Sequence, residues 1–237
     1  MPLQTVAPQR LYQQIADQLR TLITAGEFTA GSRLPAERDL AKQLGVSRPS
    51  VREALIALEV EGWVEVRTGS GVYVQDRSTT AARGNPITVN EWGPLELIRA
   101  RRVLEGEIAS LAATMAKRKD IAAMRLALAD MVRDADAGTL PIEGDRAFHS
   151  AIVQSTGNTV LIETIHGFWD SRRGPLFERL GGYFETVASW RSAIAEHTAI
   201  LDAIVAHDAP GARAAMHAHM DKSHTRFSAS WRRAKAS

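Results

Sequence analysis

The chain has 237 residues, enough for one large domain or two modest ones, with a formal net charge of +2 and no cysteine. The lack of cysteine excludes disulfides and thiolate metal ligands and fits a reducing compartment. No apolar run approaches about 18 residues and the first ten residues lack a signal-peptide core, so we expect a cytoplasmic protein without a membrane segment.

The first sixty residues predict three short helices. Residues 12–22 have an amphipathic pattern and end near a glycine. Pro35 suits the first turn of a second helix, and Gly45 suits its end. Ser47 is a good N-cap for a third helix over residues 48–58. The close spacing of the last two helices predicts a helix-turn-helix, the arrangement by which many proteins read DNA.

Arg48 and Arg52 lie four residues apart on the third helix, away from its apolar stripe. We expect both side chains to point outward near the helix N-terminus, where they suit phosphate and guanine contacts. A solvated charged face on an ordinary helical hairpin is the alternative. Acidic and basic residues cancel over residues 1–77, so any basic surface must come from placement rather than from excess charge.

Residues 63–74 predict a β-hairpin, because valines alternate with other residues on both sides of a turn at 68–71. The Gly-Ser-Gly of that turn is not interpreted as a phosphate loop, because no Gly-Lys-Ser/Thr follows it. A helix, a helix-turn-helix and a hairpin together predict a winged helix-turn-helix domain.

Residues 10–75 resemble the N-terminal domain of the GntR family of bacterial transcription regulators. The resemblance is carried by LPAERDLA, GVSRPSVREAL and EGWVEVRTGSGVYV. It implies that three arginines and the wing glycine contact operator DNA and that two serines contact phosphates. These residues are Arg38, Arg48, Arg52 and Gly69, with Ser47 and Ser50.

The rest of the chain predicts a linker and then helices only. Residues 76–91 are polar and carry glycine and proline, and from residue 92 onward about six helical segments follow without a strand signal. We therefore expect a mainly α protein with a winged helix domain at 8–75, a linker at 76–91 and an all-α antiparallel helical bundle at 92–230.

Polar residues interrupt the apolar stripes of three of these helices. Asp145 and His149 lie four residues apart on one helix face, and His197 and His219 each lie among apolar residues at helical spacing. Burial of such groups without a partner costs several kcal/mol. Separate, hydrogen-bonded core histidines would satisfy the pattern, and so would one metal site in the bundle core.

Residues 93–228 resemble the FCD-type helical effector domain of the FadR-like branch of the GntR family. Its metal-binding members carry D-x-x-x-H and two later helices with one histidine each, and the resemblance implies the ligands Asp145, His149, His197 and His219. His217 lies on another face of its helix, and His166, His207 and His224 lack such a motif. Neutral histidine and carboxylate suit Zn, Ni or Mn, and open positions would suit a carboxylate effector.

Arg101 occupies a core position on the helix predicted over residues 94–116. An ion pair with Glu105 would explain it, and so would an anion clamp, because in related regulators an arginine on this helix binds the effector carboxylate. Arg102 is the second candidate. The segment with Arg172 and Arg173 is similar to segments in regulators of sugar-acid catabolism, which suggests a hexuronate; lactate or a dicarboxylate stays open.

We therefore expect a homodimeric transcription regulator, a repressor rather than an enzyme, that binds a palindromic double-stranded operator and responds to a small carboxylate at a metal site. A metal sensor, in which the metal itself is the signal, is one alternative. A metal-dependent enzyme fused to a DNA-binding domain is another, although no general base with a motif such as HExxH is present.

Overall fold

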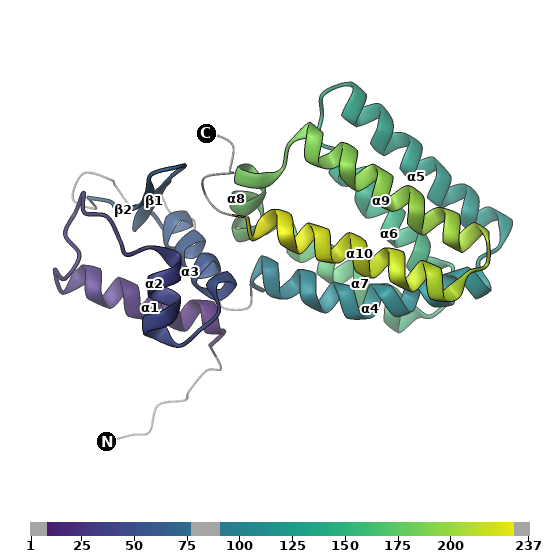
Figure 1. Cartoon of the computed structure of the whole chain (residues 1–237). Coiled ribbons are helices and arrows are strands. Elements are labelled where there is room, and N and C mark those ends of the chain that lie inside the picture. Colours follow the sequence, from purple (N-terminus) through teal and green to yellow (C-terminus); the bar gives the residue numbers. More distant parts are fainter. Residues whose placement is uncertain (1–8, 77–90, 230–237) are drawn as a thin grey trace, which may run out of the picture. The chain divides into compact units, whose positions relative to one another are not determined.

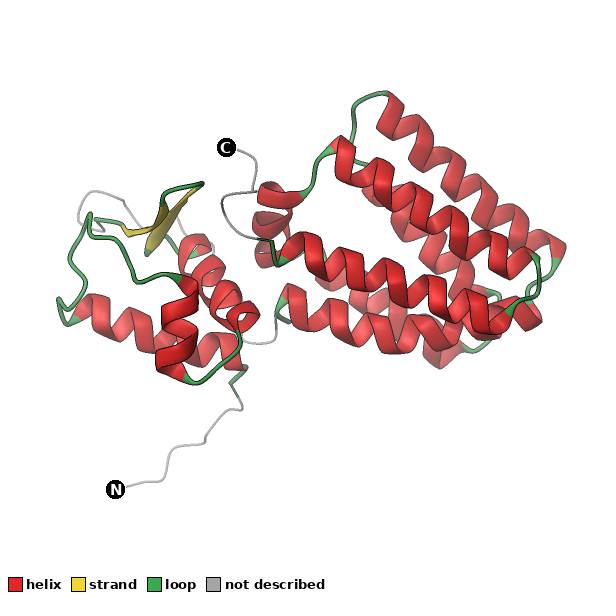
Figure 2. Cartoon of the chain, viewed as in Figure 1, coloured by secondary structure: helices red, strands yellow, loops and turns green. Residues whose placement is uncertain are grey.

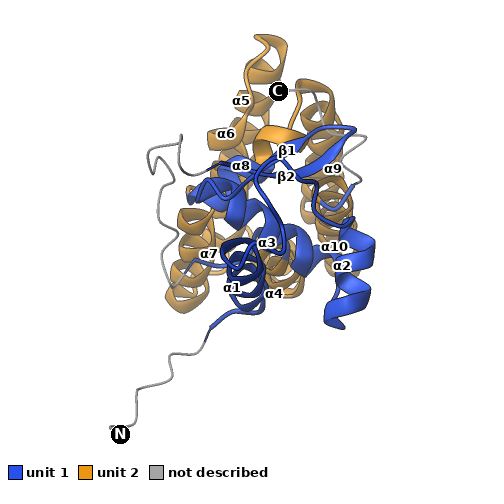
Figure 3. Ribbon diagram, turned by 90° about the vertical axis from the view of Figure 1, so that its left-hand side faces the viewer, with its two compact units in different colours: residues 1–95, 174–180, 228–237 blue, residues 96–173, 181–227 orange. Residues whose placement is uncertain are grey.

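The computed structural model describes residues 9–76 and 91–229. Over these residues the chain forms ten helices and one two-stranded antiparallel sheet (Figure 1; Figure 2), which confirms the predicted fold class. Most of the predicted linker at 76–91 lies outside the described residues. The chain divides into two compact units (Figure 3), and each is described by itself below.

Unit 1 begins with the three predicted helices, α1 (Leu11–Thr24), α2 (Glu37–Leu44) and α3 (Arg48–Val60). Gly45 ends α2 in the left-handed conformation, with φ +65°, which a residue without a Cβ adopts at little cost. The Ser47 hydroxyl caps α3 by accepting a hydrogen bond from the Ser50 amide at 3.3 Å. The turn of the helix-turn-helix therefore follows from two local end signals.

The predicted hairpin is present as β1 (Val64–Arg67) and β2 (Gly71–Val74), paired antiparallel with Val64 opposite Val74. Gly69 in the turn has φ +76°. Gly71 has φ +140°, and a Cβ added there would lie 2.5 Å from Arg33 Nε. The valines of both strands are buried, as their alternation in the sequence predicts.

Unit 2 is built from six helices and the end of a seventh. They are α4 (Pro94–Met115), α5 (Arg118–Asp136), α6 (Ile142–Gln154), α7 (Thr159–Ser171), α8 (Pro175–Phe184), α9 (Val187–Val205) and α10 (Ala209–Phe227). Helix α9 packs on α5 and α10, and α6 packs on α5 and α7. Buried apolar side chains from α4 to α7, α9 and α10 form one core around Phe148 and Ile200.

After residue 92 the described part of the chain has seven helices, where about six were expected. The boundary between α4 and α5 lies at Ala116 and Lys117, where neither glycine nor proline marks a helix end. In contrast, Gly181 and Gly182 lie inside α8 and do not interrupt it. No helix of the described residues is long and apolar enough to cross a membrane.

Helix α8 is divided between the two units. Residues 174–180 cluster with unit 1, and the helix continues from residue 181 into unit 2. Within unit 1, the Leu176 amide donates to the Glu91 carboxylate at 3.0 Å, and Arg179 pairs with Glu59 at 2.8 Å. Unit 1 is therefore completed by a segment about a hundred residues further along the chain than its winged helix.

Candidate functional site

In unit 1, three of the predicted DNA-contacting residues line one groove of about 220 Å³. Arg38 near the start of α2 has an 82% exposed side chain, and Arg48 at the start of α3 has a 57% exposed one. Gly69 supplies the edge of the groove at the wing turn. Two exposed guanidiniums beside a wing turn can bind phosphate and base edges.

The two predicted serines lie at the start of α3. The hydroxyls of Ser47 and Ser50 are 2.8 Å apart, and Ser50 is buried. Ser47 also caps the helix. Both hydroxyls therefore take part in the helix start, and a phosphate contact from either of them stays a prediction.

The expected outward orientation of Arg52 is wrong. Its side chain is 2% exposed, and its Nε and Nη2 donate to the Glu37 carboxylate at 2.8 and 2.7 Å. The reason is that α3 is buried continuously from Ser50 to Leu58, so no outward face remains beside its apolar stripe. In this conformation the Arg52 guanidinium joins α3 to the start of α2, and its contact with DNA stays a prediction.

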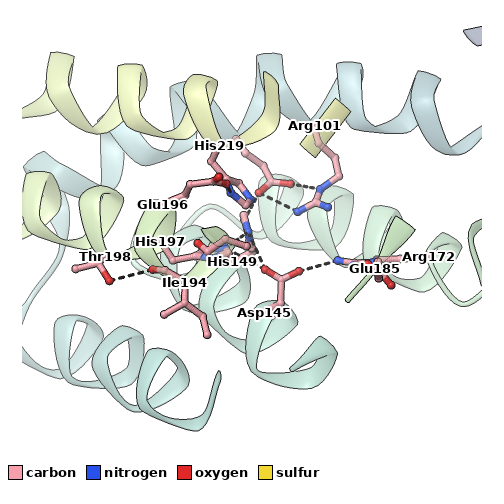
Figure 4. A network of polar contacts seen from close by, with 12 residues as sticks. Arg101, Asp145, His149, Arg172, Glu185, Ile194, Glu196, His197, Thr198 and His219 are labelled. Atoms are coloured by element: carbon pink, nitrogen blue, oxygen red, sulfur yellow. Dashed lines mark hydrogen bonds and ion pairs between the residues drawn. The ribbon is translucent and has the colours of Figure 1, made fainter. Parts of the chain in front are cut away.

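In unit 2, the structure brings together all four predicted ligand residues, and all four are buried. Asp145 and His149 come from α6, His197 from α9 and His219 from α10 (Figure 4). One nitrogen or oxygen atom from each lies within 4.8 Å of the others. The Nε2 atoms of His149 and His197 are 3.1 Å apart, and His197 Nε2 is 3.0 Å from Asp145 Oδ1.

The other ring nitrogen of each histidine faces an acceptor. His149 Nδ1 contacts the Glu105 carboxylate of α4, and His219 Nδ1 is 2.8 Å from Glu196 Oε2. His197 Nδ1 donates to the carbonyl oxygen of its own helix at Ala193, at 2.7 Å. A proton on each Nδ1 leaves a lone pair on Nε2, so the three rings are oriented as metal-binding histidines are.

Charge and burial favour the protonation states in which these side chains bind a metal, an ionised Asp145 and neutral histidines. Burial alone would raise the pKa of Asp145, but contacts with His149 and His197 and the charge of Arg172 hold that pKa well below its usual value. Burial lowers the pKa of His197. Burial, together with the charges of the other two histidines, lowers that of His219 further. The site therefore holds a carboxylate and at least two neutral imidazoles near neutral pH.

The cluster fits a divalent transition metal. Asp145 Oδ1 is buried and has no hydrogen-bond partner among the described residues, although it lies against two imidazole nitrogens. Neighbouring ligands at about 2.0–2.1 Å from a zinc ion lie roughly 2.9–3.4 Å apart, which matches the closest spacings here. Lone pairs that face one another at such distances repel without a cation between them, so these four residues can hold one.

A small cavity of about 30 Å³ adjoins the cluster and is lined by both Asp145 and His219. Three arginines from different elements also line it: Arg101, Arg172 and Arg226. Two of these arginines make cation–π contacts with Trp169: the guanidinium carbons of Arg101 and Arg172 lie 4.5 and 5.0 Å from its ring centre.

Arg101 pairs with Glu105 at 2.5 Å, as the ion-pair interpretation expects, and it also lines this cavity, so the anion clamp stays a prediction. Arg102 does not line the cavity and pairs with Asp221 at 2.7 Å. Arg173 is exposed and pairs with Glu143. The geometry therefore favours Arg101 over Arg102 as the anion ligand and adds Arg172 to it.

Two glutamates connect the cavity to the cluster, and their contacts with the histidines were not predicted from the sequence. Glu105 lies between Arg101 and His149, and Glu196 lies between Arg226 and His219, where Arg226 Nη1 is 3.0 Å from Glu196 Oε1. The i, i+4 spacing of Arg101 and Glu105 was a signal for the first. Nothing local in the sequence pairs α9 with α10, so the second pairing could not be found.

Comparisons with known proteins agree with this division of the chain. A model of "Bacterial regulatory proteins, gntR family" matches residues 11–74, and a model of the FCD domain matches residues 96–222. Among solved structures, E. coli McbR/YncC is 25% identical with a TM-score of 0.51, covering 92% of this chain and 97% of the other.

Relatives from Escherichia coli match over nearly the whole chain. The Uxu operon transcriptional regulator of Escherichia coli K12 is 38% identical over 218 residues, which are 90% of this chain and 85% of the relative. The Exu regulon transcriptional regulator of the same strain is 38% identical over 90% of this chain and 83% of its own length. A putative L-lactate dehydrogenase operon regulatory protein of that strain is 36% identical, covering 93% and 87%. The chain therefore belongs to the GntR family of bacterial regulatory proteins and carries an FCD domain.

Proposed function

We propose that this regulator binds a small carboxylate at a divalent metal ion in its FCD domain and that this binding changes its affinity for operator DNA. The cavity carries the proposal, because candidate metal ligands and three arginines line the same small space. The domain division we propose is a DNA-binding domain at 8–75, a linker at 76–91 and an effector domain at 92–230.

The cluster leaves room for an exogenous ligand. Four protein ligands at an octahedral Zn, Ni or Mn ion leave two positions open, and a carboxylate suits them. The arginines Arg101, Arg172 and Arg226 add positive charge on the same side, where bidentate guanidinium–carboxylate pairing gives orientation as well as affinity. A bound divalent metal would supply a fixed positive charge of +2, and this chain's own residues would orient the anion against it.

A hexuronate is the effector that we propose first. The supporting observation is the 38% identity to the regulators of the Uxu operon and the Exu regulon, which we associate with hexuronates. The cavity lining also includes Ser189 and Ser223, whose hydroxyls can bind the hydroxyl groups of a sugar acid. L-Lactate is the matched comparison ligand because of the 36% identical relative.

For the DNA side we propose a homodimeric repressor that reads a palindromic operator. The exposed Arg38 and Arg48 of one winged helix offer few phosphate contacts, and the local charge is balanced. Two copies related by a two-fold axis double those contacts and specify two half-sites. An effector can release the dimer from its operator only if it binds the arrangement with low DNA affinity better than the arrangement with high DNA affinity.

The test begins with the metal and the effector. Purified protein is analysed for metal content, reconstituted with Zn²⁺, and titrated by calorimetry with D-glucuronate, D-galacturonate and L-lactate. We expect His197→Ala to lose both metal and carboxylate binding, because His197 lies at the centre of the cluster. Unchanged metal content and carboxylate affinity in this variant would make the site assignment wrong.

The DNA arm uses an operator selected from a random pool, with anisotropy measured at fixed salt. We expect a footprint with two-fold symmetry and a change in DNA affinity on adding the carboxylate. A footprint without symmetry contradicts the dimer. If chelation alone changes DNA affinity and no carboxylate does, the protein is a metal sensor instead.

A further inference from the structure

Glu185 lies in the connection between α8 and α9 and faces the cavity. Its side chain is 14% exposed, and Oε1 accepts from Arg172 Nη2 at 2.7 Å (Figure 4). The other terminal nitrogen of the same guanidinium donates to Asp145 Oδ2 at 2.6 Å. Arg172 therefore holds a candidate metal ligand with one nitrogen and Glu185 with the other.

The cavity is too small for its proposed ligand while these side chains stay in place. A volume of about 30 Å³ holds on the order of two water molecules, far less than a six-carbon sugar acid. The acidic side chains in its lining are Asp145 and Glu185. Asp145 lies on α6 and contacts His149 and His197, whereas Glu185 lies in a connection between helices. Glu185 is thus the acidic group that can leave.

We propose that Glu185 is a built-in competitor that occupies the effector's carboxylate position on Arg172, and that the effector binds by displacing it. The inference rests on the proposed function, since it describes regulation of the same site. The exchange replaces one guanidinium–carboxylate pair by another, so the internal carboxylate reduces the effector's apparent affinity by the strength of its own pairing.

Gly181, one helical turn before Glu185, leaves space for the Glu185 carboxylate because it has no Cβ. A Cβ added at Gly181 would lie 2.8 Å from Glu185 Oε2, and the Gly181 carbonyl accepts the Glu185 amide at 2.8 Å. The carboxylate is the flexible end of this contact, so an alanine at 181 moves it away from Arg172 without removing any charge. Gly181→Ala and Glu185→Gln therefore weaken the same pair by different means.

Displacement of Glu185 also acts on a helix that both units share. Glu185 follows the last residue of α8, and residues 175–180 of that helix belong to unit 1, where Arg179 pairs with Glu59 and the Leu176 amide donates to Glu91. The Arg172–Glu185 pair thus fixes the end of the helix whose beginning is part of the DNA-binding unit. We expect Glu185→Gln without effector to shift DNA affinity in the same direction as effector shifts the wild type.

The test is calorimetric titration of zinc-reconstituted wild type, Glu185→Gln and Gly181→Ala with D-glucuronate, D-galacturonate and L-lactate. Loss of one charge-assisted pair predicts about tenfold tighter carboxylate binding in each variant. The double variant should bind no more tightly than Glu185→Gln. Glu143→Gln is the matched control, because it removes an exposed carboxylate from the neighbouring Arg173, and its affinity should equal that of the wild type.

Unchanged affinity in Glu185→Gln, while the wild type binds, overturns this inference and leaves the proposed function intact. An equal gain in Glu143→Gln also overturns it, because general charge would then be the cause. If neither the wild type nor any variant binds these carboxylates, the proposed function fails and this inference fails with it. If Glu185→Gln does not fold, Gly181→Ala, which keeps every charge, decides the question.

Discussion

Replacement of Arg52 by alanine tests whether the buried guanidinium of α3 is a structural group or a DNA ligand. In the structure it makes two hydrogen bonds to Glu37, at 2.8 and 2.7 Å, and both side chains are buried. The variant leaves the Glu37 carboxylate buried without this partner. We therefore expect a large loss of stability in unit 1 and a loss of operator binding that follows from it.

The magnitude follows from the geometry. Removing one partner of a buried, hydrogen-bonded ion pair costs about 3–5 kcal/mol, mainly because the other charge stays desolvated. Arg48 Nη2 is already 3.9 Å from Glu37 Oε2 and can move closer, so we expect the lower end of that range. A loss of about 3 kcal/mol is a large part of the roughly 5–15 kcal/mol that stabilises a folded domain.

The assay is urea unfolding followed by circular dichroism, fitted with separate transitions because two units need not unfold together. Arg52→Ala, Glu37→Ala and the double variant form a cycle, in which a structural pair gives a coupling free energy of about 2 kcal/mol or more. Arg38→Ala is the control, since its side chain is 82% exposed and should leave stability unchanged.

A structural role for Arg52 is refuted if Arg52→Ala has the same free energy of unfolding as the wild type while its operator affinity falls. That result would mean that the pair with Glu37 contributes little and that Arg52 contacts DNA, as the sequence pattern first indicated. Tighter operator binding by a stable Glu37→Ala variant would point the same way, since this change releases Arg52.

Three further predictions concern the two sites. Arg48→Ala should weaken operator binding and lower the salt slope by about 1, as anisotropy at several salt concentrations would show; an unchanged slope contradicts a phosphate contact. Chelation should lower the calorimetric stability of zinc-loaded protein by about 4 kcal/mol at a thousandfold excess of free metal over Kd, and His197→Ala should not respond. Glu105→Gln should reduce zinc affinity about 10–100-fold. In the metal-free protein burial alone would lower the pKa of His149, but the charge of Glu105 raises it; Glu105→Gln should therefore move the His149 titration, followed by NMR, to lower pH, and a move to higher pH contradicts the assignment.

Sequence reasoning reached the parts of the fold whose causes are local. Gly45 and Ser47 fix a helix end and a helix start within three residues, and the valines of the wing alternate with a period of two. The end of α4 was expected at Ala116 and lies at Met115, although neither glycine nor proline marks it. The pair Gly181 and Gly182 would favour a helix end, but α8 continues through both.

The candidate site shows the same limit. Asp145 and His149 share a helix face, so their proximity follows from spacing alone. The convergence of α9 and α10 on them came from family resemblance, because periodicity leaves a lone core histidine undecided. The orientation of Arg52 depends on Glu37 in another helix, and no pattern within α3 contains that information.

The division of α8 between the units bears on how this regulator can be taken apart and rebuilt. A hybrid that joins this DNA-binding head to another effector domain would be made most simply by one cut at the linker. Here a cut at residue 76 would separate the head from residues 174–180, with the buried Leu176 and Leu180 and the Arg179 partner of Glu59. A working hybrid would have to transfer this helix segment with the winged helix, or redesign it to match the new one.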